Sequence, residues 1–176
     1  MQDILKYLPA QEGVRVIKPD EGRPFNLGPV HFRWKVRSED SAHAYTMFEL
    51  HLAPGGGVDL HSHASPETFY ILEGEMTFFR VHDGAQEHFI CGPGSTIVIP
   101  PNALHALFNK SDGECRLLDV STGSHQDFFD EVQLADQRES FASLEPKAAV
   151  VRVSEIARKN EMYLAPYDVN TEKETE

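Results

Sequence analysis

From residue 14 to residue 120 the chain alternates between short runs of strand-forming residues and clusters of turn-forming residues. The turn clusters read PDEG, APGGG, HDG, CGPG and SDG, in which glycine and proline favour tight reversals. Short strands at this regular spacing predict an all-β sandwich or barrel. The expected strands lie at residues 14–17, 29–36, 45–52, 68–74, 75–81, 88–91, 95–100, 105–109 and 115–120.

Two helices are expected after the last strand. Residues 125–138 carry apolar side chains close to a 3.6-residue period. A second helix is expected at residues 154–164, with Ser154 as its N-cap, and residues 140–150 are expected to be a linker. The expected division of the chain is an N-terminal arm at 1–13, a β-barrel at 14–121, and a helical extension with a disordered tail at 122–176.

Charge and composition exclude several classes of protein. The 176 residues include 16 lysines and arginines against 28 aspartates and glutamates, and the formal charge of −12 argues against a nucleic-acid partner. No apolar run approaches the ~20 residues that span a bilayer, and the first residues lack the pattern of a signal peptide. We therefore expect a cytoplasmic protein without a membrane partner, in which Cys91 and Cys115 are free thiols.

One segment, GGGVDLHSHASPETFYILEG at residues 55–74, groups two imidazoles and a carboxylate. Side chains two positions apart in a strand share a face, so His61 and His63 are expected to point the same way. Glu67 follows a break in the strand, and a bend there can bring its carboxylate beside both rings. Two histidines and a carboxylate suit a divalent transition metal and leave positions open for substrate or oxygen. His105 offers a fourth ligand if the barrel closes.

Ordinary roles must be weighed for every histidine, because the chain has nine of them. A single histidine is more often a hydrogen-bonded surface or core residue than a ligand. The nearby glutamate and the flanking glycines favour the metal hypothesis for His61 and His63. Ordinary roles are expected for the histidines without such neighbours, which are His31, His43, His51, His82, His88 and His125.

These residues match the two motifs of a known superfamily. The first cupin motif, G-x5-HxH-x3,4-E-x6-G, is met by Gly55, His61, His63, Glu67 and Gly74. The second, G-x5-PxG-x2-H-x3-N, is met by Gly94, Pro100, His105 and Asn109. Asn102 stands where the second motif has glycine, and asparagine tolerates the positive φ that this turn requires. The chain therefore resembles a single-domain cupin over about residues 30–121.

The resemblance implies an antiparallel jelly-roll β-barrel that holds one divalent transition metal, which would be Fe, Ni, Mn, Co or Zn. The implied ligands are His61, His63, Glu67 and His105. The segment 68–79 and the segments after the barrel are similar to those of bacterial quercetin 2,3-dioxygenase-like cupins. This likeness implies a dioxygenase that cleaves a flavonol or related enol substrate with O2, with Glu67 as the catalytic base. Inward-facing residues expected to line the substrate pocket are Phe69, Ile71, Met76, Phe78, Val98 and Leu107.

Two other functions remain open. One is a redox-neutral metal cupin, a lyase or an isomerase, in which the metal acts only as a Lewis acid. The other is a non-catalytic cupin that binds a small molecule. Few basic residues lie near the motifs, which disfavours a sugar-phosphate isomerase. We also expect a homodimer, because cupin barrels commonly pair through their sheets; Trp34 would then lie either at an exchanging edge or in the core.

Overall fold

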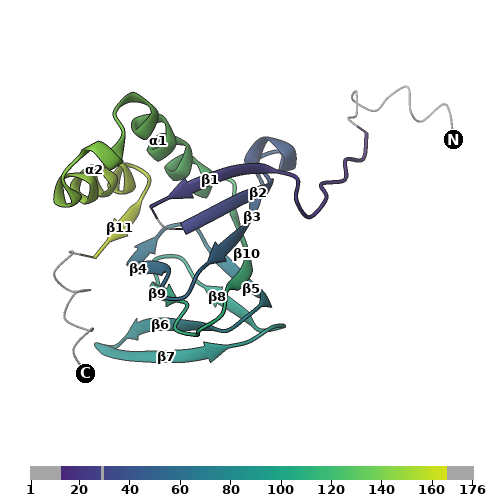
Figure 1. Cartoon of the computed structure of the whole chain (residues 1–176), viewed down its shortest axis with the longest axis vertical. Coiled ribbons are helices and arrows are strands. Elements are labelled where there is room, and N and C mark those ends of the chain that lie inside the picture. The colour runs from purple at the N-terminus through teal and green to yellow at the C-terminus, as the bar shows by residue number, and fades with distance from the viewer. Residues whose placement is uncertain (1–12, 29, 166–176) are drawn as a thin grey trace, which may run out of the picture.

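The computed structural model describes residues 13–28 and 30–165, and its strands form two antiparallel sheets (Figure 1). The strand orders are β1-β2-β3-β10-β5-β8 and β11-β4-β9-β6-β7. The chain passes from one sheet to the other between β3 and β4 and again between β4 and β5, as in a jelly roll. The expected all-β jelly roll with C-terminal helices is therefore confirmed. The strands are β1 (Arg23–Leu27), β2 (Val30–Val36), β3 (Tyr45–Leu52), β4 (Gly57–His63), β5 (Glu67–Glu73), β6 (Met76–His82), β7 (Ala85–Cys91), β8 (Thr96–Ile99), β9 (Leu104–Phe108), β10 (Cys115–Thr122) and β11 (Met162–Leu164).

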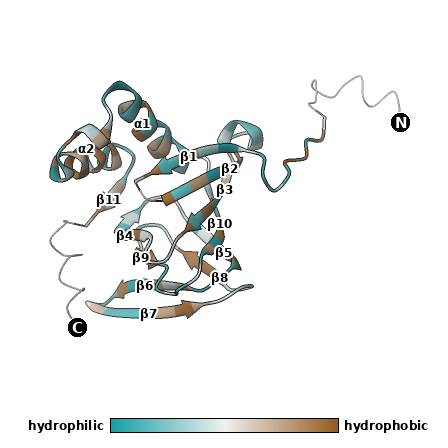
Figure 2. Cartoon of the chain, viewed as in Figure 1, coloured by the Kyte–Doolittle hydropathy of each residue, from teal (hydrophilic) through white to brown (hydrophobic). Residues whose placement is uncertain are grey.

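The hydrophobic core follows from the two-residue period of the strands. Hydrophilic and hydrophobic residues alternate along β2 (Figure 2), and along β3 the side chains of Phe48, Leu50 and Leu52 are buried while that of His51 is exposed. The Phe32 ring lies 5.4 Å from that of Phe48. Such pairs give each sheet one apolar face that is removed from water, and this burial drives the two sheets together.

Trp34 is a core residue. Strand β2 lies between β1 and β3, so Trp34 is not on a sheet edge. Its side chain is buried, with ring centroids 4.9 Å from Phe48 and 5.8 Å from Phe129. The expectation of a core role is thus confirmed and that of an exchanging edge is wrong, because pairing with β1 uses the backbone groups that an exchange would need.

The C-terminal helices lie together at one end of the molecule, away from the β6–β7 hairpin (Figure 1). Helix α1 (His125–Arg138) has the expected bounds and buries Phe128, Phe129 and Val132. Helix α2 (Pro146–Lys159) begins earlier than expected, because the fixed φ of proline suits the first turn of a helix. The expected linker at 140–150 is therefore wrong in its second half, and its first half contains the short 3-10 helix η3 (Phe141–Ser143).

Residues 162–164 form strand β11 rather than the end of a helix. Asn160 caps helix α2, and Glu161 with φ 54° reverses the chain direction. Met162 then pairs with His63 and Leu164 with His61, so β11 covers the edge of strand β4. The apolar spacing of residues 154–164 led to the wrong prediction of a helix up to residue 164, because strand β4, with which residues 162–164 pair, is remote in sequence.

The expected strand at residues 14–17 is also wrong, since Val14 and Val16 are 101% and 76% exposed and the first strand is β1. A single apolar run cannot form a strand without a partner that buries one of its faces. Most of the expected N-terminal arm and the expected disordered tail lie outside the described residues. Among residues 13–28 and 30–165, no helix is long and apolar enough to cross a membrane.

Candidate metal centre

Strand pairing places the motif residues around one point between the sheets. His61 and His63 alternate with the less buried Leu60 and Ser62 along β4, as expected from their spacing. His105 on β9 pairs directly with His61. Glu67 is the first residue of β5 in the opposite sheet, so its carboxylate reaches the imidazoles across the interior.

The four side chains converge closely. Oε2 of Glu67 lies 3.3 Å from Nε2 of His63 and 3.4 Å from Nε2 of His105. The ring centroids of His61 and His105 are 4.1 Å apart, and the donor atoms of His61, His63 and His105 lie within 4.8 Å of one another. The four residues are at most 6% exposed. Metal–nitrogen bonds of about 2.1 Å put neighbouring donor atoms about 3 Å apart, so this spacing fits a single ion.

Backbone carbonyls fix the orientation of the three rings. Nδ1 of His61 donates to the carbonyl of Asp59 at 2.7 Å, and Nδ1 of His105 donates to that of Ala103 at 2.8 Å. Nδ1 of His63 donates in the same way to the carbonyl of the residue two positions on, at 2.6 Å. A carbonyl oxygen can only accept, so Nδ1 of each ring is used as a donor and Nε2 is left to face the centre. A divalent cation needs donors of this form.

Burial and charge make the cluster attract a cation. Burial and the neighbouring His105 lower the pKa of His61 to about 3, so its ring is neutral at pH 7. Burial would raise the pKa of Glu67, but contacts with His105 and His63 outweigh burial and hold this pKa well below its usual range. The buried Nε2 of His105 has no hydrogen-bond partner. Burial would lower the pKa of His63, but its contact with Glu67 raises it. A buried carboxylate among imidazoles is favourable when positive charge lies beside it, and a metal ion would supply that charge.

Asp119 lies next to Glu67 on the neighbouring strand. It lies on β10, which pairs with β5, and its side chain is 2% exposed. Burial and the neighbouring carboxylate of Glu67 raise the pKa of Asp119 well above its usual range. The raised pKa favours the neutral form of Asp119 beside the carboxylate of Glu67. The sequence analysis did not single out Asp119, because nothing in the local pattern distinguishes it from a core position of β10.

His125 is the site residue that the sequence analysis missed. Its Nε2 atom lies 3.5 Å from Oε1 of Glu67, and its ring centroid lies 4.7 Å from that of His63. The donor atoms of His63, Glu67 and His125 lie within 4.8 Å of one another. The ordinary role expected for His125 stays a prediction, but its surroundings differ from those that its sequence neighbours suggest: burial lowers its pKa to about 4, and its ring faces the candidate metal centre. The available signal was its position at the start of a helix that directly follows the last jelly-roll strand.

The residues expected to line a substrate pocket do not share one environment. Val98 is 67% exposed, so the expectation that it faces the interior is wrong. Val98 pairs with Thr68, and both residues lie on the face of β5 and β8 that also exposes Tyr70. The other expected residues are at most 3% exposed and belong to the core; they are Phe69, Ile71, Met76, Phe78 and Leu107. Their contact with a substrate stays a prediction.

Comparison with known proteins relates this geometry to a family. Residues 48–121 match the family described as "Cupin domain". Germin-like protein subfamily T member 3 from Arabidopsis thaliana is 34% identical over 77 residues, which cover 43% of this chain and 34% of that protein. The match therefore spans about a third of this curated relative's length.

Solved structures share the fold. The polyketide cyclase RemF from Streptomyces resistomycificus has a TM-score of 0.56 at 22% identity, covering 63% of this chain and 80% of that chain. A predicted oxalate decarboxylase from Thermotoga maritima also has a TM-score of 0.56 at 22% identity, covering 61% and 98%. Residues 48–121 of this chain are therefore a cupin domain, in agreement with the jelly-roll topology and with the two histidine motifs that meet between the sheets.

Proposed function

We propose that this protein is a metal-dependent cupin dioxygenase that cleaves a flavonol or a related enol substrate with O2. One observation carries the proposal: three imidazoles whose Nδ1 atoms are tied to backbone carbonyls aim Nε2 at the same point as the Glu67 carboxylate. This donor set suits one divalent ion, Fe, Ni, Mn, Co or Zn, held by His61, His63, Glu67 and His105. The likeness to quercetin 2,3-dioxygenase-like cupins supports the choice of reaction.

The bound ion would supply Lewis-acid stabilisation of an enolate oxygen and open positions for substrate and O2. Side chains of the protein transfer the proton of the substrate. Glu67 is the catalytic base that accepts the proton of the substrate hydroxyl, a role typically worth about 10²–10⁴-fold in rate. Asp119 lies on the neighbouring strand β10 beside Glu67 and so supports the carboxylate from behind.

The surroundings of the centre support an apolar, uncharged substrate. Phe69 and Phe78, with ring centroids 5.3 Å apart, belong to the apolar core between the sheets. The basic residues nearest the motifs are already paired: Arg80 with Glu87, and Arg116 with Glu73. Both arginines lie at the surface rather than at the centre, which disfavours a phosphorylated substrate.

The second candidate is a redox-neutral lyase or isomerase. The observation that favours it is the buried pair of Asp119 and Glu67, two neighbouring carboxyl groups that can exchange protons with a substrate without any oxidant. RemF, which shares this fold, is described as a polyketide cyclase. In this reading the ion acts only as a Lewis acid.

An oxygen-electrode assay separates these functions. The metal-loaded protein is mixed with a flavonol such as quercetin, and O2 uptake is followed together with loss of the flavonol absorbance. The proposal predicts equal molar consumption of O2 and flavonol, and no reaction under argon. If the substrate is still converted under argon, the dioxygenase proposal is wrong and the redox-neutral candidate is favoured. If the substrate binds but is not converted in either atmosphere, the remaining hypothesis is a non-catalytic binding protein.

The homodimer and the cytoplasmic location expected from the sequence complete the proposal. Exposed apolar side chains support pairing through the sheets, since Phe89 and Ile90 on the edge strand β7 are 46% and 64% exposed. Light scattering during gel filtration tests the dimer: a mass near twice the 19.8 kDa of the chain is expected, and a mass near 19.8 kDa would contradict it.

A further inference from the structure

Helix α1 delivers a fourth imidazole to the metal centre. Nε2 of His125 lies 3.5 Å from Oε1 of Glu67, close to the 3.3 and 3.4 Å that separate Oε2 from His63 and His105. Donor atoms around one ion are about 3 Å apart when adjacent and about 4.2 Å apart when opposite. The donor atoms of His63, Glu67 and His125 lie within 4.8 Å of one another, so small side-chain adjustments would bring them into this range.

The side chain of His125 has no competing use among the described residues. It is 4% exposed, so little of the ring is open to bulk water. Its neighbours are the Phe129 ring, at a centroid distance of 5.2 Å, and the imidazole of His63. Glu67 is its polar partner. A buried ring that faces only apolar groups and the metal ligands is suited to bind the same ion.

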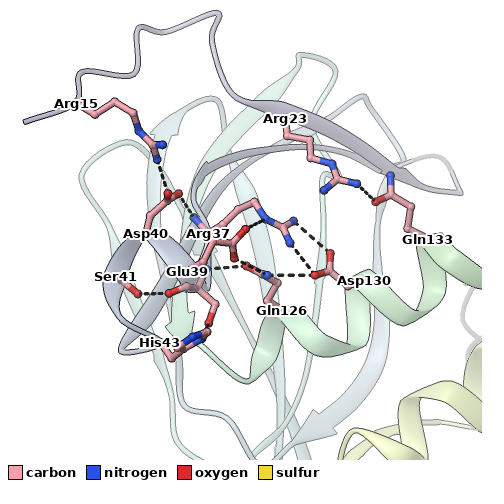
Figure 3. Close-up of polar contacts among 11 residues, drawn as sticks. Arg15, Arg23, Arg37, Glu39, Asp40, Ser41, His43, Gln126, Asp130 and Gln133 are labelled. Atoms are coloured by element: carbon pink, nitrogen blue, oxygen red, sulfur yellow. Dashed lines mark hydrogen bonds and ion pairs between the residues drawn. The ribbon is translucent and has the colours of Figure 1, made fainter. Parts of the chain in front are cut away.

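The start of helix α1 is held firmly on the 3-10 helix η2 (Ser38–Ser41). The side-chain oxygen of Gln126 accepts a hydrogen bond from the backbone N–H of Ser38 at 2.7 Å. Arg37 donates two hydrogen bonds to Asp130, at 3.2 and 2.7 Å (Figure 3). These contacts fix the helix at the residue that follows His125 and one turn later. They therefore fix the position of the His125 imidazole relative to Glu67.

Close packing also fixes the chain just before the helix. A Cβ atom added to Gly123 would lie 2.4 Å from the carbonyl oxygen of His43, which only glycine avoids. The side chain of His43 in turn bonds Ser38 at 2.7 Å. The segment that carries His125 is thus positioned from both sides by residues that lie outside the cupin domain at 48–121.

We propose that His125 is an additional protein ligand of the metal, supplied by helix α1, so that metal binding and docking of this helix stabilise each other. The inference deepens the proposed function and rests on its metal centre. His61, His63, Glu67, His105 and His125 would then leave fewer positions on the ion for exogenous ligands than the four motif residues alone. Binding of both an enolate and O2 would require His125 to move away from the centre together with the start of helix α1.

The test compares full-length wild-type protein with His125→Gln and with His82→Gln. Glutamine can still donate a hydrogen bond to Oε1 of Glu67, so this variant removes the imidazole ligand and retains a polar partner. His82 is 75% exposed on strand β6 and serves as the matched control. The Kd for Co²⁺ is measured by competition with a chelator, and the number of bound imidazoles is obtained by X-ray absorption spectroscopy of the Co²⁺ form.

We expect His125→Gln to weaken Co²⁺ binding at least tenfold and to lower the imidazole count from four to three, with His82→Gln unchanged. Hydrogen exchange of the α1 amides should slow when Co²⁺ is added to the wild type but not when it is added to His125→Gln. A wild-type count of three imidazoles, or a Kd of His125→Gln within twofold of wild type, would overturn this inference and leave the proposed metal centre intact. A wild type that binds no Co²⁺ would overturn both. The wild-type count decides the question even if the variant folds poorly.

Discussion

Nε2 of His105 lies 3.4 Å from Oε2 of Glu67, although the two residues belong to opposite sheets. Both side chains are buried, and the Nδ1 atom of His105 is committed to a backbone carbonyl. A ring nitrogen therefore faces a carboxylate where water cannot screen the contact. A cation between the two atoms would stabilise this arrangement, so a bound metal would also stabilise the fold.

Removal of the metal is expected to destabilise the protein. At a free metal concentration 100 times the Kd, binding adds about 2.7 kcal/mol to the free energy of unfolding. For a chain of this size that corresponds to a Tm higher by roughly 5–11 °C, at 2–4 °C per kcal/mol. Calorimetry of the metal-loaded protein, with and without a chelator, measures the difference. Re-addition of Co²⁺ should restore the Tm. An equal Tm with and without the chelator would contradict the metal centre.

Substitution of two ligands should separate metal binding from turnover. Glu67→Gln keeps a neutral oxygen donor and the three imidazoles, so part of the metal should remain, while oxygenase turnover is lost with the base. His61→Ala removes a ring that is 6% exposed and should lose both metal and turnover. Elemental analysis and O2 uptake provide the two measurements. Full metal content in both variants would show that the ligand set is wrong.

The contact between Arg37 and Glu39 predicts a pH dependence of stability. The hydrogen bond from Arg37 lowers the pKa of Glu39 to about 2. Because the folded-state pKa is depressed, the contribution to stability is complete above the ordinary pKa of about 4.5 and is lost as the pH falls toward 2. The side chain of Glu39 is 57% exposed, so the contribution stays below about 1 kcal/mol.

Urea unfolding of wild type and Glu39→Gln between pH 6 and pH 3 measures this contribution. The difference in unfolding free energy should be largest at pH 6 and should shrink toward pH 3. Glu75→Gln, in the β5–β6 turn, is the control, since Glu75 is exposed and lies outside this helix contact. A difference between wild type and Glu39→Gln that grows on acidification would contradict the assignment.

Two glycines with the same backbone conformation should differ in their tolerance of alanine. Gly74 and Gly84 have φ of +77° and +75°, a conformation that costs a non-glycine residue about 1–2 kcal/mol. A Cβ atom at Gly74 would lie 2.3 Å from the carbonyl oxygen of Glu114, whereas at Gly84 it would meet open space. Gly74→Ala should therefore cost roughly 1–3 kcal/mol more than Gly84→Ala. Equal costs in thermal unfolding would show that the crowding is relieved by a shift of the β10 segment.

Much of the centre could be predicted because it depends on local rules. The two-residue period of a strand places His61 and His63 on one face whatever surrounds them. The motif that contains Pro100 and Asn102 places His105 just after a turn, and Asn102 does adopt a positive φ of 63°. Helix α1 was predictable for the same reason, since its apolar residues repeat with the helical period over residues 125–138.

The errors concern residues whose surroundings are set by remote partners. Val98 reads as an interior position of its strand, but the register with β5 turns it to the surface. Residues 162–164 have the apolar spacing of a helix, yet they pair with β4 and become β11. His125 has no neighbour in sequence that suggests a ligand, and only the docking of α1 on Arg37 and Ser38 brings it to Glu67.

The amino-acid order was therefore enough to predict an all-β fold and strands near their observed positions, since these follow from backbone periods and turn chemistry over a few residues, while the jelly roll and the candidate ligands came from the match to two family motifs. The folded arrangement decided that helix α1 brings His125 close to Glu67 and that Asp119 lies beside Glu67. The physical reason is that these contacts join surfaces of separate elements. Their geometry depends on how the sheets and helix α1 pack, which no local pattern encodes.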